Sequence, residues 1–208
     1  MAPRLGTSTE AHTTTNATSL TFSFTSTGEP LLVRVNLRGQ TADPTSITVT
    51  YNGVSVPLIS GASAINTGSH QYSGLYYLAS PATGANNVVV SWTNASACVS
   101  GACSVSEGGL PNNGNGATNT SSSASVTITS NVGGLVVDCS SVPTTRTITS
   151  DTTEDFTGTS TGATTNIIGK GSHAAGGASV VMSYTIGGGT AAWAMAGCNI
   201  PPSSGFFF

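Results

Sequence analysis

Residues 19–35 read SLTFSFTSTGEPLLVRV, two strand-like segments separated by a Gly-Glu-Pro turn. The same layout returns at residues 123–139, SASVTITSNVGGLVVDC, which begin 104 positions later (123 minus 19). In the first segment of each copy, apolar residues alternate with Ser or Thr, which is the pattern of a half-buried β-strand. This return predicts a fold assembled from two similar halves.

The second segment of the opening stretch also alternates. Leu31, Val33 and Val35 fall on one face of the expected strand, and Arg34 falls on the other with further polar residues. Because side chains of a strand point alternately to opposite faces, we expect the apolar face to be the core face. The polar face is then the less informative side of this strand.

Further strand-like segments fill both halves. Residues 47–51 and 54–59 flank Asn52-Gly53, a pair typical of two-residue hairpin turns. Near the end of each half, VVSWT at residues 89–93 is matched by VMSYT at residues 181–185. No segment of ten or more residues shows a helical period. The sequence predicts an all-β, jelly-roll-like β-sandwich of about ten antiparallel strands, built from two pseudo-repeated halves.

The chain is expected to form a single folded domain between two tails. A Gly/Asn-rich stretch in the middle is the expected connector, and the Thr/Ser-rich start is a flexible or extended arm. Residues 60–71 are expected to be a polar loop. The expected divisions are an arm at 1–17, a domain at 18–200 with halves at about 18–106 and 123–200, a connector at 107–122 and a tail at 201–208.

Composition narrows the class of protein. Only 6% of the 208 residues are charged, 38% are hydrophobic, and the net charge is −3. Disordered chains usually combine low hydrophobicity with high net charge, so this chain is expected to fold. Five Lys and Arg residues are too few to neutralise several phosphates on one face, which argues against nucleic acid as a partner. No apolar run reaches the roughly 18–20 residues needed to span a bilayer.

The first nineteen residues lack the apolar core of a secretory signal. Two expectations follow: a renumbered mature chain, or a protein made in a cytoplasm and kept there until assembly or lysis. The second fits a structural protein of a virus.

Four stretches carry a resemblance: TSITVTYNGVSVPLI, GLYYLASPATGANNVVVSWT, ACVSGACSV and AAWAMAGCNI. Together they resemble a β-sandwich domain that recurs in phage virion proteins and in large secreted bacterial surface proteins. This chain has Asn52-Gly53 where that domain usually has Gly-Gly, and Tyr76 where Trp is common. The resemblance implies the fold and a structural role. It brings no catalytic motif.

Catalytic and metal-binding patterns are sparse. His12 lies in the arm, while His70 and His173 lie in expected loops, and no two histidines have metal-ligand spacing. A G-x-S-x-G nucleophile motif is absent from the sequence. We therefore expect no catalytic residues, no metal site and no cofactor.

The acidic cluster and the cysteines each allow more than one structural interpretation. The acidic cluster at residues 151–155 is interpreted as a solvated turn, with a Ca²⁺ site or one carboxylate of a glycosidase pair as alternatives. Cys98, Cys103, Cys139 and Cys198 are interpreted as small buried hydrophobic residues, with one or two disulfides as the alternative.

Aromatic residues supply the candidate binding sites. Trp92 and Trp193 lie in alternating strands and are expected in the core or an interface. An expected loop precedes three tyrosines, which makes them candidates for a sugar-binding platform: Tyr72, Tyr76 and Tyr77. Three consecutive aromatic residues in the tail could fold onto their own domain or anchor the chain to a partner: Phe206, Phe207 and Phe208.

Three functional hypotheses follow. The first is a non-catalytic structural protein of a virus particle, above all a capsid decoration (cement) protein that binds the major capsid protein or other virion subunits as a homo-oligomer, with a trimer favoured. The second is a surface adhesion or carbohydrate-binding module, located outside the cell. The third is a subunit of an extracellular filament whose arm completes a neighbour's sheet.

Overall fold

The structure is a computed structural model that describes residues 1–161 and 165–203. All regular structure in these residues is β-strand, which confirms the predicted all-β fold. The strands are β1 Arg4–Leu5, β2 Thr9–His12, β3 Ala17–Ser26, β4 Leu31–Gly39, β5 Thr45–Tyr51, β6 Val54–Ser55, β7 Leu58–Asn66, β8 Gln71–Leu78, β9 Gly84–Ser106, β10 Asn112–Ser121, β11 Ser123–Thr129, β12 Leu135–Pro143, β13 Thr147–Ser150, β14 Thr153–Thr161, β15 Asn166–Ala175, β16 Ser179–Gly187 and β17 Ala191–Ile200.

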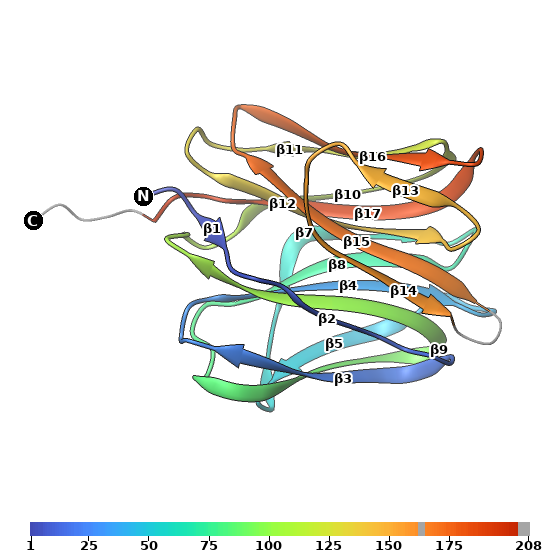
Figure 1. Cartoon of the computed structure of the whole chain (residues 1–208), viewed down its shortest axis with the longest axis horizontal. Coiled ribbons are helices and arrows are strands. Elements are labelled where there is room, and N and C mark those ends of the chain that lie inside the picture. Colours follow the sequence, from blue (N-terminus) through green and yellow to red (C-terminus); the bar gives the residue numbers. More distant parts are fainter. Residues whose placement is uncertain (162–164, 204–208) are drawn as a thin grey trace, which may run out of the picture.

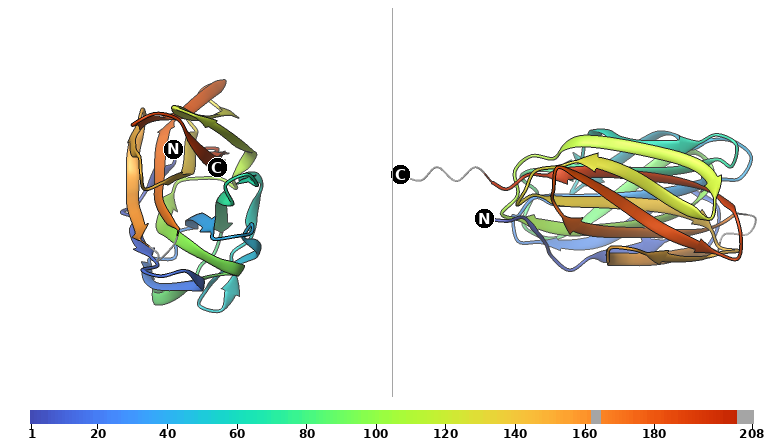
Figure 2. Two further views of the ribbon diagram at one scale, coloured as in Figure 1. Left: turned by 90° about the vertical axis from the view of Figure 1, so that its right-hand side faces the viewer. Right: turned by 90° about the horizontal axis from the view of Figure 1, so that it is seen from above.

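The strands stack in four layers (Figure 1; end-on and from above in Figure 2). The first outer sheet contains β3, β5, β6 and the start of β9, and the first inner sheet contains β7, β8, β4 and the end of β9, with β1 and β2 at its edge. The second inner sheet has the order β10-β17-β12-β15-β14, and the second outer sheet has the order β11-β16-β13. Each half of the chain therefore supplies one outer and one inner sheet.

Strand β9 joins the first outer sheet to the first inner sheet. Its residues 84–93 pair with β3 and β5, and its residues 96–104 pair with β4. Between these parts Asn94 has a φ of 65°, a left-handed conformation that Asn tolerates better than most residues. This local turn lets one long strand serve two layers.

An apolar core fills each of the three spaces between layers. Because the inner sheets are covered on both faces, nearly every residue of β4, β8, β12 and β17 is buried. The outer strands β3 and β11 are covered on one face only, and they show the alternation seen in the sequence. Each half is thus a small sandwich of its own, and the two halves meet through a third core.

The two halves have the same order of strand partners. The order β5-β9-β3 in the first outer sheet corresponds to β13-β16-β11 in the second. The registers differ, because Ser19 pairs with Ser91 whereas Ser123 pairs with Thr185, the match of Thr93. The common partner order is consistent with the predicted duplication, which remains a prediction.

Segments expected to lack regular structure contain strands. The arm supplies β1 and β2, which pair with β9, and the connector supplies β10, which pairs with β17. The loop expected at 60–71 contains the end of β7, and two further strands, β14 and β15, were not predicted. In β10 the physical reason is close packing: a Cβ at Gly116 would overlap the backbone of Ser63 in β7, so a loop-like, glycine-rich sequence is needed there.

We predict that the central core makes the two halves unfold as one unit. Leu32 is fully buried between the inner sheets, and Leu32→Ala should destabilise the chain by about 2–5 kcal/mol in a single transition. Leu110 is 70% exposed, so the control Leu110→Ala should change stability by less than about 0.5 kcal/mol. Chemical denaturation followed by circular dichroism measures both. Two separate transitions, only one of them shifted by Leu32→Ala, would contradict the prediction.

Candidate functional site

The centre of the molecule holds a buried arginine. Arg34 on β4 is 0% exposed, and its side chain points from the first inner sheet toward the second. The expectation that the polar face of this strand is the less informative one is therefore wrong, since both faces of β4 are covered. An arginine in this position needs acceptors for its N–H groups and a counter-charge.

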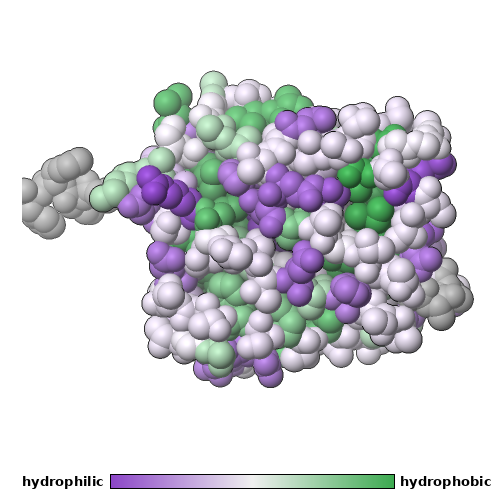
Figure 3. Space-filling model, in the orientation of Figure 1, coloured by the Kyte–Doolittle hydropathy of each residue, from purple (hydrophilic) through white to green (hydrophobic). Residues whose placement is uncertain are grey.

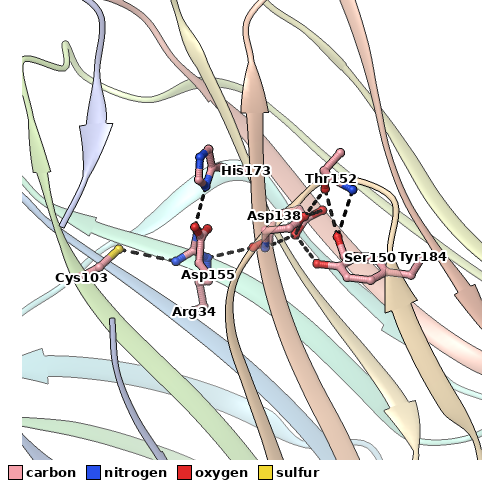
Figure 4. A network of polar contacts seen from close by, with 9 residues as sticks. Arg34, Cys103, Asp138, Ser150, Thr152, Asp155, His173 and Tyr184 are labelled. Carbon is pink, nitrogen blue, oxygen red and sulfur yellow. Dashed lines mark hydrogen bonds and ion pairs between the residues drawn. The ribbon is translucent and has the colours of Figure 1, made fainter. Parts of the chain in front are cut away.

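Arg34 contacts three other strands (Figure 4). Its Nε donates to the Asp138 carbonyl oxygen of β12 at 2.9 Å, and its Nη2 lies 2.5 Å from Asp155 Oδ2 of β14. Its Nη1 lies 3.5 Å from the Cys103 Sγ of β9. The guanidinium carbon also lies 5.8 Å from the centre of the Phe156 ring, a cation–π distance. One side chain thus links the first inner sheet to two strands of the second.

The charge of Arg34 is maintained despite its burial. Burial alone would lower the pKa of the guanidinium, but Cys103, Asp155 and Asp138 together raise it above its ordinary value. The ion pair with Asp155 is itself largely buried, with side-chain exposures of 0% and 8%. Removing one partner of such a pair leaves an uncompensated charge in the interior, which costs several kcal/mol.

Asp155 reaches Arg34 because of a β-bulge. In the pairing of β14 with β15, Glu154 faces Ser172 and Phe156 faces Gly171, which leaves Asp155 as the extra residue. A bulge turns its extra side chain away from the regular alternation. The second oxygen of Asp155 lies 2.5 Å from His173 Nδ1, so the carboxylate joins the buried Arg34 to a histidine side chain that is 31% exposed.

Glycines make room for this centre. A Cβ at Gly171 would lie 2.5 Å from Arg34 Cδ and would overlap the Phe156 ring. A Cβ at Gly101 would lie 3.1 Å from an atom of the same ring. The sequence GKGSH at residues 169–173 therefore places glycine where the arginine and the phenylalanine pack.

Asp138 occupies the position that matches Arg34 in the second copy, 104 residues later (138 minus 34). Its carboxylate accepts hydrogen bonds from the Tyr184 hydroxyl at 2.6 Å and from the Ser172 backbone N–H at 2.8 Å. Burial raises the pKa of this carboxyl to about 6, although these hydrogen bonds and Arg34 act in the opposite direction. The pKa of Asp138 is therefore well above the ordinary value for an aspartate, which is near 4.

The acidic cluster is used within the chain. Glu154 pairs with Lys170, and the Asp151 carboxylate accepts a hydrogen bond from the Ser183 hydroxyl at 2.6 Å. With Asp155 paired to Arg34, the expected solvated turn is wrong for this residue, which is an interior ion-pair partner. Within residues 1–161 and 165–203, no group of three or more His, Cys, Asp or Glu side chains is arranged to hold a metal.

The three tyrosines proposed for sugar binding are interior residues. Tyr72 and Tyr76 lie in the core between the first outer and first inner sheets, where their hydroxyls are 2.9 Å apart. Tyr77 lies in the central core. Burial raises the pKa of Tyr76 and of Tyr77 to about 12. None of these rings forms an exposed platform in this structure.

The remaining aromatic candidates have separate outcomes. Trp92 and Trp193 were expected in the core or an interface, and both are buried in the cores of the first and second halves. Phe206, Phe207 and Phe208 lie outside the described residues, so their proposed partner-binding role remains a prediction.

The four cysteines are free and buried, which confirms their interpretation as small core residues. Burial raises the pKa of each thiol, that of Cys198 to about 12, so the thiols are protonated at neutral pH. The histidines lie apart: His12 is exposed on β2, and His70 bonds Asp43 at 2.7 Å.

An open trough lies on the first outer sheet. It has a volume of about 410 Å³ and lies beside the Asn52-Gly53 turn, where β5 meets the start of β9. Its lining carries no charge: Thr50, Asn52, Gly53, Ala85, Asn86, Asn87 and Val89. Amide and hydroxyl groups of this kind suit a neutral ligand rich in hydroxyls.

Comparison of the chain with protein-family models, with curated proteins and with solved structures gave no match. Among the described residues, none belongs to a helix long and apolar enough to cross a membrane.

We predict a pH-dependent penalty from Asp138. Because its pKa is raised on folding, the native state binds this proton more tightly, so stability falls as pH rises from about 4 to 6 and levels off above. Asp138→Asn keeps an acceptor for Tyr184 but has no carboxyl group to titrate. Relative to the wild type, its free energy of unfolding should therefore be about 1–3 kcal/mol higher at pH 7 than at pH 4. Urea unfolding across this range measures the difference. Asp151→Asn, an exposed control, should keep the wild-type slope, and an unchanged slope in Asp138→Asn would refute the prediction.

Proposed function

We propose that this chain is a non-catalytic structural protein of a virus particle, displayed on the shell as a capsid decoration protein. The observation that carries the proposal is that most ionisable side chains of the inner sheets are paired with other groups of the same chain. Arg34, Asp155, Lys170 and Glu154 pair with one another across strands, and Asp138 bonds Tyr184 and Ser172. The Arg34–Asp155 pair and the Asp138–Tyr184 hydrogen bond connect different layers, and the Glu154–Lys170 pair lies within the second inner sheet. The strands of the outer sheets carry no charged residue.

The outer strands present matched, uncharged faces. Exposed positions of β3 and β11 carry only Ser or Thr: Thr18, Ser19, Thr21, Ser23, Thr25, Ser123, Ser125, Thr127 and Thr129. On the side shown in Figure 3, apolar residues are scattered in small groups among polar ones. A multilayered body with such faces suits a subunit that must persist on a particle surface. The resemblance of residues 45–59 and 74–93 to domains of phage virion proteins supports the same role.

The test begins with neighbouring genes, because a decoration protein is expected beside capsid and portal genes. Shells assembled from that capsid protein should then carry the chain into the pellet on sedimentation, and light scattering should give the mass of a trimer. Shells alone and the chain alone are the controls. A stable monomer that stays in the supernatant with every shell preparation would overturn the proposal.

The open trough supports a second candidate, a carbohydrate-binding surface module. Three asparagine side chains, Asn52, Asn86 and Asn87, line it without a charged residue. Binding on a glycan array that is lost in Asn87→Ala, but kept in Thr127→Ala on the opposite outer sheet, would favour this candidate. An array without binding would remove it.

A filament role would require strand exchange, because the arm already pairs with β9 of its own chain.

A further inference from the structure

Three buried N–H groups on one strand pair lack a hydrogen-bond partner. They are Asn36 Nδ2, Arg38 Nε and Gln71 Nε2. Each is a donor, and a buried donor without an acceptor costs about 1–3 kcal/mol. Such a group in a native protein calls for a missing partner, and here that partner must be an acceptor.

The three groups lie on the same face of the first inner sheet. Arg38 and Gln71 are direct partners in the β4–β8 ladder, so their side chains leave the sheet on one side with Cβ atoms about 5 Å apart. Asn36 is two residues before Arg38, and its partner Ser73 donates to its Oδ1 at 2.8 Å. The donors therefore form a row along the seam between the two inner sheets.

The second inner sheet covers this row but supplies no acceptor to the three unpartnered N–H groups. Arg38 Nη1 donates to the Asn166 carbonyl oxygen of β15 at 3.0 Å, which fixes the guanidinium at the start of that strand. Opposite Asn36 stands Gly169, where even a Cβ would lie 3.0 Å from Nδ2. In Figure 1 β4 ends and β15 begins at the end of the molecule away from β1. Arg38, which is partly exposed, is therefore the member of the row nearest that end.

The charges around this row also indicate that Arg38 needs an acceptor. Arg34 has Asp155 and Lys170 has Glu154, but among the described residues no carboxylate pairs with Arg38. Arg38 is half-buried, and this burial lowers the pKa of its guanidinium, which is the mark of a desolvated cation without a counter-charge. Gln71, fully buried beside it, offers an amide N–H rather than a negative charge.

We propose that Arg38 and Gln71 bind a small oxyanion of the carboxylate or phosphate class at the mouth of this seam. The anion accepts hydrogen bonds from the guanidinium and from the Gln71 amide, and its charge offsets that of Arg38. Asn36 stands deeper in the row as a third donor. A single cation without a carboxylate partner suits a small anion and does not suit a polyanion such as nucleic acid, which needs several cations.

Thermal unfolding at constant ionic strength tests the site. Inorganic phosphate or acetate in place of chloride should raise Tm progressively with concentration, because a ligand of the native state stabilises it by mass action. Arg38→Gln should weaken anion binding by at least about tenfold, while Arg4→Gln, an exposed arginine far along the chain, should leave it unchanged. A response to both anions supports the whole class, and a response to one alone supports that member.

A second variant keeps the test independent of folding defects. Gln71→Glu places a carboxylate beside Arg38, so it should raise stability without added anion and should abolish the response to phosphate and acetate. Two results would overturn the proposal: equal Tm values in phosphate, acetate and chloride, as expected if water alone satisfies these donors, or an anion response that survives in both Arg38→Gln and Gln71→Glu.

Discussion

The structure at the centre of this molecule depends on a fully buried guanidinium group. Arg34 has lost its contact with water, and the cost of burying that charge must be offset by partners held at fixed positions. The bulge at Asp155, the glycine at position 171 and the carbonyl of Asp138 all meet this requirement. Because these partners belong to the second half, the two inner sheets are fixed relative to each other by a polar interaction as well as by the central core.

The four-layer arrangement explains the composition. Two inner sheets covered on both faces need long apolar runs, which β4, β12 and β17 provide. The outer sheets need apolar residues on one face only, and their other face is free to carry Ser and Thr. Because the chain has so few charged residues and several of them lie inside, its polar contacts with solvent are made mostly by hydroxyl and amide groups.

The sequence predicted the outer strands and the fold class because alternation is a local signal. β3, β5, β11 and β16 each show their period within ten residues. β10 and β14 escaped prediction because Gly, Thr and Asn dominate them, and β15 escaped it because glycines interrupt its apolar residues. Glycines of these strands are needed where strands of different sheets touch, as at Gly116 and Gly171. Such contacts depend on the tertiary structure and leave only a loop-like composition in the sequence.

The candidate sites were harder to foresee than the fold. Arg34 and Asp155 are 121 residues apart, so no spacing rule could join them. The tyrosines were misplaced because β8 was expected to follow a surface loop, whereas it lies inside the first inner sheet with both faces covered. One signal was available: an arginine within an otherwise apolar run, together with the alternating glycines of GKGSH, indicates a buried cation and the space made for it.

A double-mutant cycle on Arg34 and Asp155 tests the central claim most directly. If the buried ion pair couples the two halves, Arg34→Met and Asp155→Asn should each destabilise the chain by about 3–5 kcal/mol, because each leaves the other group unpaired in the interior. The double variant should then lose much less than the sum of the two, giving a coupling energy above about 1 kcal/mol. Additive losses, with no coupling between the two positions, would contradict the account.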